Sequence, residues 1–577
     1  MTPPPTGDGI DRVWRRIRER LGVSARAFSI NARNPNLLRA QLSFGAAWTS
    51  EWALTVVLAV VAYRDGGAEA AGIVAFVRLA PAAVIAPLGT ALADRFPRDR
   101  VLVWSCLIRA AALGAAATVL AAAAPLLGVY ALAVVATAAF TIFRPAHSAL
   151  LPGLCMTPLE LTSANVVRGL VDSLSTLAGP LLAALLLDVA SVAAAFAAVA
   201  ALALASGLAL VGIAYEAPPR ARAAPLARIA AEIGEGFRAL WRYRDAGLLT
   251  WLGLMQTFTR GTLNVFAVVI AIKLLGAGAP GVGVLTAAVG VGAVGGSLGA
   301  SLVVGGRRLA SIEGIGVMLW GLPLALVGAF QQEPVVLVLM AIIGIGNALV
   351  DIGIFTLLTR LVPEALLARV LGAFESLVAL TVALGSLATP FAIDLFGIRG
   401  ALVAVGLLAP VCVAIAWRRL RAIDASIEHR DAEIQVLKKV GMFQPLPMAA
   451  IDGLAVHVDH AELAAGQEVF HQGDVGDRFY VIAAGKADVI GDRRVVNTLG
   501  PGDGFGEIAL LRGTVRTTTV CARTRLRLYT LDRGHFLAAI GGYRASTEEA
   551  DALIARRLAV HGADRERLPG GPRPAGP

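Results

Sequence analysis

Long apolar stretches follow one another from residue 40 to residue 417, separated by short polar segments. Each stretch has 18 or more residues of mainly apolar character, which is enough to cross the hydrocarbon core of a bilayer as a helix. The pattern predicts an all-α polytopic membrane domain of about 12 transmembrane helices, arranged as two six-helix halves. The expected helices are residues 40–63, 68–93, 100–123, 126–146, 162–187 and 189–214, then 247–275, 280–304, 309–330, 334–360, 367–394 and 399–417.

The pattern changes after Ala422. The segment IEHRDAEIQVLKKV has the spacing of an amphipathic helix. From Ala455 onward, apolar residues become short and alternating, with Gly-Asp turns between them, which is typical of a small β domain. Ser546 and Glu549 have the spacing of a capping box, so we expect a last helix to begin there.

These changes in texture divide the chain into seven segments. The expected segments are a basic cytoplasmic N-terminal segment (1–38), an N-terminal six-helix half (39–214), a central loop (215–246), a C-terminal six-helix half (247–418), a linker helix (419–440), a β domain (441–561) and a disordered tail (562–577). Within the central loop, residues 226–241 are amphipathic.

The distribution of arginines predicts how the chain is oriented in the membrane. The chain is 57% hydrophobic and 16% charged, with a net charge of +10. Its arginines gather in the loops that lie on one side when the N-terminus is inside, so the positive-inside rule places both termini in the cytoplasm. We therefore expect a multi-pass protein of a bacterial inner membrane. Its partner is the lipid bilayer, and we expect no nucleic acid as a partner.

One short segment in the β domain, FGEIALLRGTVRTTTV, has the composition of an anion-binding loop. Gly506 allows the backbone to approach a ligand closely, and the following residues can form a helical turn whose amides point at an anion. Arg516 offers a planar fork that suits phosphate oxygens. A carboxylate beside them, Glu507, suits a sugar hydroxyl, so the combination indicates a nucleotide.

Residues 436–560 resemble a cyclic nucleotide-binding domain, a β-roll with flanking helices, as in the catabolite activator protein and the regulatory subunit of protein kinase A. The matching stretches, in order, are VLKKVGMFQPLP, AAGQEVFHQGDVGDRFYVIAAGKADV and FGEIALLRGTVRTTTV. The resemblance implies that Glu507 binds the ribose 2′-hydroxyl and Arg516 binds the cyclic phosphate. The other residues that it implicates are Gly506, Ile508, Ala509, Thr517 and Thr518. Threonine at position 517 leaves cAMP and cGMP both open as the regulatory ligand.

The segment PLGTALADRFPRDRVLV resembles the signature loop of the major facilitator superfamily. By that resemblance Asp94, with Arg95 and Arg98, forms a motif that biases which side of the transporter is open. The stretch that begins FRPAHSALLPG resembles facilitators that export macrolides and siderophores. The resemblance implies a secondary transporter, with proton-coupled efflux of a small molecule as the expected activity.

Ionisable residues within membrane spans are costly, so they are candidates for proton coupling or substrate binding. Our candidates among the carboxylates in predicted spans are Glu51, Asp172, Asp351 and Glu375. We expect Glu51 to be the proton site, because few compensating charges lie near it in the sequence. Asp172 lies one helical turn from Arg168, so the two can form an ion pair.

Signatures of enzymes are absent from the sequence, which has no nucleophile–base constellation, no P-loop and no regular metal-ligand spacing. His457, His460 and His471 are close in sequence, but they fit surface positions of a β-roll equally well. We expect no catalytic site, no metal and no cofactor. Two alternatives stay open: a membrane-anchored cyclic nucleotide receptor that does not transport, and an exporter whose C-terminal domain is a ligand-free docking module.

Overall fold

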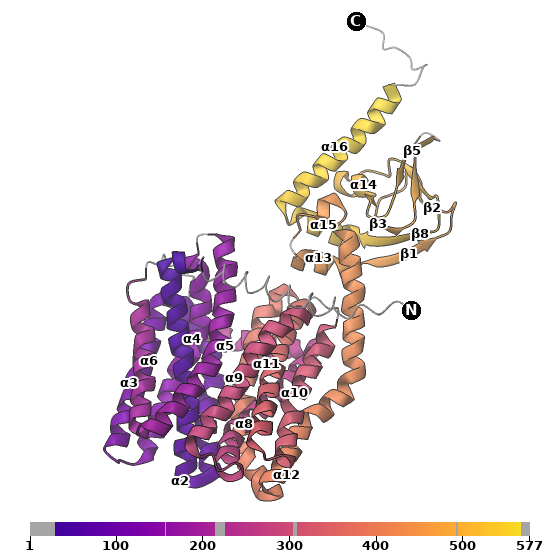
Figure 1. Cartoon of the computed structure of the whole chain (residues 1–577). Coiled ribbons are helices and arrows are strands. Elements are labelled where there is room, and N and C mark those ends of the chain that lie inside the picture. The colour runs from indigo at the N-terminus through magenta and orange to yellow at the C-terminus, as the bar shows by residue number, and fades with distance from the viewer. Residues whose placement is uncertain are drawn as a thin grey trace, which may run out of the picture. The chain divides into compact units, whose positions relative to one another are not determined.

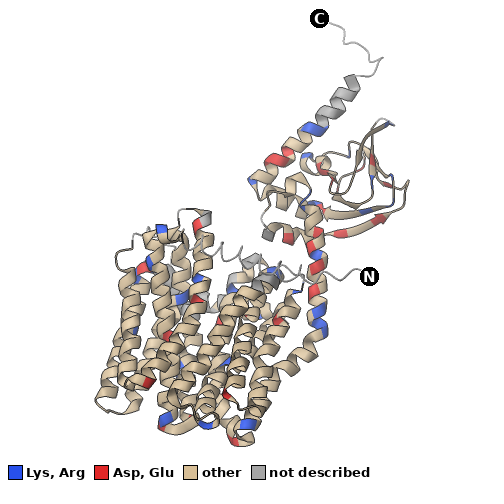
Figure 2. Cartoon of the chain, in the orientation of Figure 1, with Lys and Arg blue, Asp and Glu red and all other residues tan. Residues whose placement is uncertain are grey.

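The computed structural model describes residue 29 and residues 31–155, 157–213, 226–303, 308–446, 448–491 and 494–566. The chain divides into two compact units, Met1–Ala422 and Ile423–Pro577. The first unit is a bundle of long helices, and the second holds all the strands of the described residues (Figure 1). Lysine, arginine, aspartate and glutamate are sparse along the bundle helices, as the sequence pattern predicts (Figure 2).

The first half of the bundle begins with a 61-residue helix, α2 (Pro35–Arg95). Its backbone is not helical at Gly66 and Gly67, and Gly67 has a φ of +65°, a conformation that only glycine adopts at low cost. This break lies between the two spans that we predicted at residues 40–63 and 68–93. The remaining helices of this half are α3 (Arg98–Ala121), α4 (Leu126–Leu154), α5 (Pro158–Val189) and α6 (Val192–Leu210).

The second half is preceded by α7 (Leu226–Arg242), the amphipathic helix expected in the central loop. Its bundle helices are α8 (Arg244–Val269) with a π-helical turn η1 (Ile270–Leu274), α9 (Gly278–Val303), α10 (Leu309–Ala329), α11 (Glu333–Leu361) and α12 (Glu364–Leu437). Helix α12 has its own break at Gly397, where φ is +69°. Beyond that break α12 runs without interruption to Leu437, through the residues expected to form a separate linker helix.

Ten of the described helices are long and apolar enough to cross a membrane. Two of the ten, α2 and α12, contain the breaks at Gly67 and Gly397. The count of about twelve spans therefore stays a prediction. Small residues allow close packing between α9 and α11, because a Cβ atom at Gly292 would overlap the carbonyl oxygen of Ala341.

The second unit contains two four-stranded antiparallel sheets, as the alternating pattern predicts. The strands are β1 (Asp459–Leu463), β2 (Glu468–Phe470), β3 (Arg478–Ala484), β4 (Ala487–Gly491), β5 (Arg494–Leu499), β6 (Gly504–Phe505), β7 (Thr519–Ala522) and β8 (Leu526–Asp532). One sheet has the order β1-β8-β3-β6 and the other β2-β7-β4-β5. Apolar residues of both sheets, among them Ile482, Val520 and Leu528, form a common buried core.

Helices flank the sheets. They are the end of α12, the turn η2 (Gly441–Phe443), α13 (Met448–Ala455), α14 (Glu507–Arg512), α15 (Arg533–Gly541) and α16 (Arg544–Glu566). The predicted capping box is wrong: α16 begins at Arg544, and Ser546 is fully buried in its first turn. The turn is fixed instead by packing on α15, where Thr547 Oγ1 donates to the carbonyl of Ile540 at 2.8 Å.

Candidate functional site

A pocket in the second unit contains most of the segment that resembles an anion-binding loop. Its empty space is about 850 Å³, open solvent at its mouth included, which is in the range of small-molecule sites. Its apolar lining comes from Phe470, Val489, Leu499, Phe505 and Val520, and its loop lining from Gly506, Glu507, Ile508, Ala509, Arg516, Thr517 and Thr518. All seven residues predicted to contact a nucleotide thus line one pocket, and their roles toward a ligand stay predictions.

Gly506 sets the entry to α14. Its φ is +90°, and a Cβ atom at this position would lie 2.6 Å from Nη1 of Arg516. Both the backbone conformation and the space therefore require glycine. The chain then forms the short helix that we predicted, with Glu507 in its first turn and Gly513 in the left-handed region after its end.

Arg516 is held against the floor of this pocket and is 3% exposed. Its Nη1 donates to the carbonyl of Gly506 at 2.8 Å, and its Nη2 donates to the carbonyl of Arg478 at 2.7 Å. The guanidinium also lies 4.3 Å from the ring centroid of Phe470. Burial lowers the pKa of Arg516 from its ordinary value, because it disfavours the charged guanidinium. An anion in the pocket would act in the opposite direction and favour the charged form.

Glu507 is 1% exposed and forms an ion pair that the sequence did not suggest. Nη1 of Arg557, on α16, donates to Oε1 of Glu507 at 2.7 Å, and Nη2 of the same arginine donates to the carbonyl of Gly504 at 2.8 Å. Arg557 itself lines the pocket, as does its neighbour Arg556. The last helix therefore supplies two cations to a site otherwise built by the β-roll.

Two buried polar atoms of the pocket have no hydrogen-bond partner within the described chain. They are Oε2 of Glu507, an acceptor, and Nε of Arg516, a donor. Buried polar groups are usually satisfied, because leaving one unpaired costs about 1–3 kcal/mol. A ligand with one hydroxyl group and one anionic group would satisfy both atoms.

A second cavity lies in the helical bundle, with about 1400 Å³ of empty space, open solvent included. Three predicted carboxylates line it: Asp172, Asp351 and Glu375. Arg144 and Arg260 line the same cavity, so it contains charges of both signs. Asn347 donates to Oδ2 of Asp351 at 2.9 Å, and Arg168 donates to Ser148 at 2.6 Å. Among the described residues, no ion pair joins Arg168 to Asp172.

Glu51 does not line that cavity, and although it is isolated from other charges in the sequence, it is not isolated in space. Its role as the proton site stays a prediction. Arg78 Nη2 lies 3.1 Å from its Oε1, and Arg109 Nη1 lies 2.6 Å from its Oε2. The two arginines are distant in sequence, but helix packing brings them to the carboxylate. Glu51 is therefore compensated by two buried cations, which is the arrangement of a structural ion-pair network.

The structure describes only part of the loop that resembles the facilitator signature. Asp94 and Arg95 fall at the end of α2, where the side chains lie outside the described residues. Arg98, at the start of α3, donates from Nη1 to the carbonyl of Ala149 on α4 at 2.7 Å. This bond ties the loop to α4, while the role predicted for Asp94 stays a prediction.

The family model of the Major Facilitator Superfamily matches residues 42–385, which is more than half of the chain. The chain belongs to the major facilitator superfamily. A second model, that of the cyclic nucleotide-binding domain, matches residues 460–543 of this facilitator. The match contains the loop from Gly506 to Thr518 and ends before Arg557.

Curated relatives match about a fifth of the facilitator. The cAMP-dependent protein kinase regulatory subunit of Schizosaccharomyces pombe is 38% identical over 127 residues, which are 22% of this chain and 28% of that protein. The CRP-like cAMP-activated global transcriptional regulator of Mycobacterium tuberculosis is 29% identical over 129 residues, 22% of this chain and 58% of that protein. The facilitator thus spans between about a quarter and three fifths of these relatives.

Solved structures match a similar share of the chain. The regulatory domain of Toxoplasma gondii PKA with cAMP has 26% identity and a TM-score of 0.19, over 22% of this chain and 48% of that chain. The N-terminal domain of a transcriptional regulator from Streptomyces coelicolor A3(2) also has 26% identity and a TM-score of 0.19, over 24% of this chain and 99% of that chain.

Sequence reasoning missed several charged residues of the facilitator. Arg557 reaches its pocket from a helix that carries no motif, so no local signal indicates it. Arg144 lies in the stretch FRPAHSALLPG, which we had interpreted only as a family resemblance, and it lines the bundle cavity. Glu313 on α10 is fully buried, and neither of its carboxylate oxygens has a hydrogen-bond partner among the described residues. An intramembrane carboxylate is a signal in itself, because such residues are rare outside functional sites.

Proposed function

We propose that this facilitator is a secondary transporter whose activity responds to a cyclic nucleotide bound in the C-terminal pocket. The transported molecule is a small, polar or charged compound that occupies the bundle cavity. Transport is export across a bacterial inner membrane, driven by protons, with the N- and C-termini in the cytoplasm. The regulatory ligand is cAMP, and cGMP is the competing ligand that the test must include.

The proposal of nucleotide binding rests on the two buried atoms of the pocket that have no hydrogen-bond partner within the described chain. Oε2 of Glu507 accepts a hydrogen bond from the ribose 2′-hydroxyl, and Nε of Arg516 donates to an oxygen of the cyclic phosphate. The apolar lining, which includes Phe470 and Leu499, leaves room for the base and the sugar. Curated relatives whose names include cAMP support the choice of that nucleotide.

The proposal of proton-coupled transport rests on the charged residues that line the bundle cavity. A proton-coupled exporter needs a carboxylate that takes up a proton in one state and releases it in the other. Asp351 lies in the same cavity as Arg260 and Arg144, so substrate binding changes its electrostatic surroundings. We assign the exchangeable proton to Asp351, with Asp172 and Glu375 as the neighbouring carboxylates of the same cavity.

The two activities are coupled through α12. This helix includes the last apolar stretch of the bundle and also residues 423–437 of the second unit. A nucleotide shifts the transport cycle only by the difference between its affinities for the transporter's states, which is ordinarily about 1–3 kcal/mol.

Calorimetry on the purified full-length protein in detergent, with cAMP and then cGMP, tests the ligand assignment. Binding of one nucleotide at micromolar concentration supports the proposal, and the tighter ligand is the regulatory one. Arg525, an exposed residue paired with Glu462, provides a matched control, because R525A removes an arginine of the same domain outside the pocket. If neither nucleotide binds, the result would favour the alternative in which the C-terminal domain is a ligand-free docking module.

Flux in proteoliposomes tests the coupling. The vesicles contain a pH-sensitive dye, and a panel of small-molecule substrates is added outside, with and without the nucleotide inside and outside. Proton movement that depends on a substrate and changes with nucleotide supports the full proposal. Nucleotide binding without any flux across the panel would instead favour a membrane-anchored receptor.

A further inference from the structure

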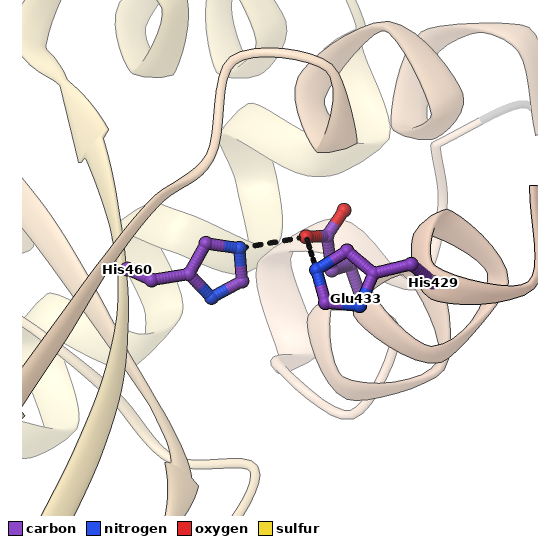
Figure 3. A group of neighbouring side chains, drawn as sticks. All are labelled: His429, Glu433 and His460. Carbon is purple, nitrogen blue, oxygen red and sulfur yellow. Dashed lines mark hydrogen bonds and ion pairs between the residues drawn. The ribbon is translucent and has the colours of Figure 1, made fainter. Parts of the chain in front are cut away.

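Three side chains of the second unit meet far from the nucleotide pocket: His429, Glu433 and His460. His429 and Glu433 are on the final part of α12, four residues apart, so they lie on one face of the helix. His460 is on β1, 27 residues further along the chain. Figure 3 shows both imidazole rings directed at the same carboxylate oxygen of Glu433.

The donor atoms are close enough for one ion. Nε2 of His460 lies 2.9 Å from Oε1 of Glu433, and Nε2 of His429 lies 3.3 Å from the same oxygen. One ligand atom from each residue lies within 4.8 Å of the other two. A tetrahedral ion with bonds of about 2.0–2.1 Å holds its ligand atoms roughly 3.3 Å apart, so small side-chain rotations suffice.

The charge balance favours a cation at this position. Glu433 is 5% exposed, and within the described chain its ion pairs and hydrogen bonds are made only with the two histidines. A buried carboxylate oxygen that faces two imidazole nitrogens is a favourable place for a cation, because burying a charge without a counter-charge is costly. The neighbouring arginine, Arg430, is directed to Asp452 instead, with 3.9 Å between Nη1 and Oδ2.

The cluster is open to solvent, and its donor atoms suit a transition metal ion. The side chains of His429 and His460 are 68% and 47% exposed, so an ion and a water ligand can reach the site from solvent. Two imidazole nitrogens and one carboxylate oxygen are a donor set that suits Zn²⁺ and its neighbours in the first transition series, and a poor one for Mg²⁺ or Ca²⁺.

We propose that His429, Glu433 and His460 bind a divalent transition metal ion, with Zn²⁺ as the representative, and that the ion fastens the end of α12 to strand β1. Three protein ligands leave a fourth position to water. The proposal is independent of the nucleotide, because none of the three residues lines that pocket. It also replaces our expectation that His460 is an ordinary surface residue.

The test uses the full-length protein in detergent, purified through an affinity tag that contains no histidine and stripped of metal with a chelator. The protein is then equilibrated with Zn²⁺ and desalted, and its zinc is counted by mass spectrometry. We expect about one ion per chain to be retained, and a tenfold or greater loss of affinity in H429A, H460A and E433Q. Both histidines are exposed enough for their substitution to leave folding intact, which thermal unfolding of the same samples checks.

His471 provides the matched control, because it is an exposed histidine beside two carboxylates, Glu468 and Asp474. H471A should retain zinc like the unsubstituted protein. With Co²⁺ in place of Zn²⁺, visible absorption of a tetrahedral ion should appear in H471A and vanish in H429A. Failure of the unsubstituted protein to retain zinc, or equal retention in H429A and H460A, would overturn the proposal and leave a hydrogen-bonded histidine–carboxylate cluster. Neither outcome bears on nucleotide binding, which calorimetry reports separately.

Discussion

Nη1 of Arg557 lies 2.7 Å from Oε1 of Glu507, although the two residues are 50 positions apart in the chain. This ion pair joins the last helix to the loop that we assign to nucleotide binding. It uses one oxygen of the carboxylate and leaves the other, Oε2, without a hydrogen-bond partner in the part of the chain that the structure describes. The pair therefore orients Glu507 and keeps one acceptor available to a ligand.

Arg557→Ala should destabilise the second unit, because it leaves a buried carboxylate without a counter-charge. We expect a loss of about 1–3 kcal/mol in the free energy of unfolding. Adding Glu507→Gln should recover part of that loss, with a coupling energy of about 0.5–3 kcal/mol. A double-mutant cycle by thermal unfolding measures the coupling. Additive effects of the two substitutions would contradict the ion pair.

Arg516→Lys should weaken cyclic nucleotide binding at least tenfold, although the charge is kept. The lysine ammonium cannot donate to Gly506 and Arg478 and at the same time present a donor equivalent to Nε. Titration calorimetry with cAMP measures the change, and R525A should bind like the unsubstituted protein. Equal affinity in R516K would exclude the geometric role of the guanidinium.

Gly506→Ala should both destabilise the β-roll and weaken the binding of nucleotide. An alanine there has to adopt a φ of +90° and to displace Nη1 of Arg516. We expect a cost of about 1–3 kcal/mol in unfolding free energy. Gly500→Ala is the control, because φ is not positive at Gly500 and no atom would contact its Cβ within 4 Å. Similar unfolding temperatures for the two variants would argue against the prediction.

Substitutions of Glu51 and Asp351 should have different consequences. Glu51→Gln removes the charge that balances Arg78 and Arg109, so it should destabilise the bundle by about 3 kcal/mol or more. Asp351→Asn should leave the unfolding temperature in detergent nearly unchanged and abolish proton-coupled flux. Fluorescence-detected size exclusion measures the first effect and proteoliposome flux the second. A stable, uncoupled Glu51→Gln would return the proton site to Glu51.

The lowered pKa of Asp532 predicts that the folded protein loses stability in acid. Hydrogen bonds from His535 hold the pKa of this carboxyl below its ordinary value of 3.8, and the carboxylate caps α15. A lowered folded-state pKa means that the contribution is present above the unfolded pKa and is lost as the pH falls through the folded pKa. Unfolding temperature should therefore fall less between pH 5 and pH 3 in Asp532→Asn, which keeps the cap, than in the unsubstituted protein. An unchanged pH profile would contradict this role.

The sequence alone determined the classes of structure. Runs of apolar residues identify membrane helices because a bilayer requires every backbone group to be satisfied within its own segment, which is a local requirement. Alternation after Ala455 identifies strands because successive side chains of a strand point to opposite faces, which is also a local property. The segment from Gly506 to Thr518 contains the turn, the short helix and the arginine of the pocket in one stretch. Seven predicted pocket residues therefore lie together in the structure.

Only the tertiary structure decided which charges meet. Arg78 reaches Glu51 from beyond the break in α2 and Arg109 reaches it from α3, while Arg557 reaches Glu507 from the last helix. His460 on β1 reaches Glu433 on α12, although η2 and α13 lie between them in the chain. Coulomb interactions and metal coordination depend on distances of a few ångströms, and packing sets these distances independently of separation along the chain. A carboxylate that is isolated in sequence, such as Glu51, can therefore be fully compensated in space.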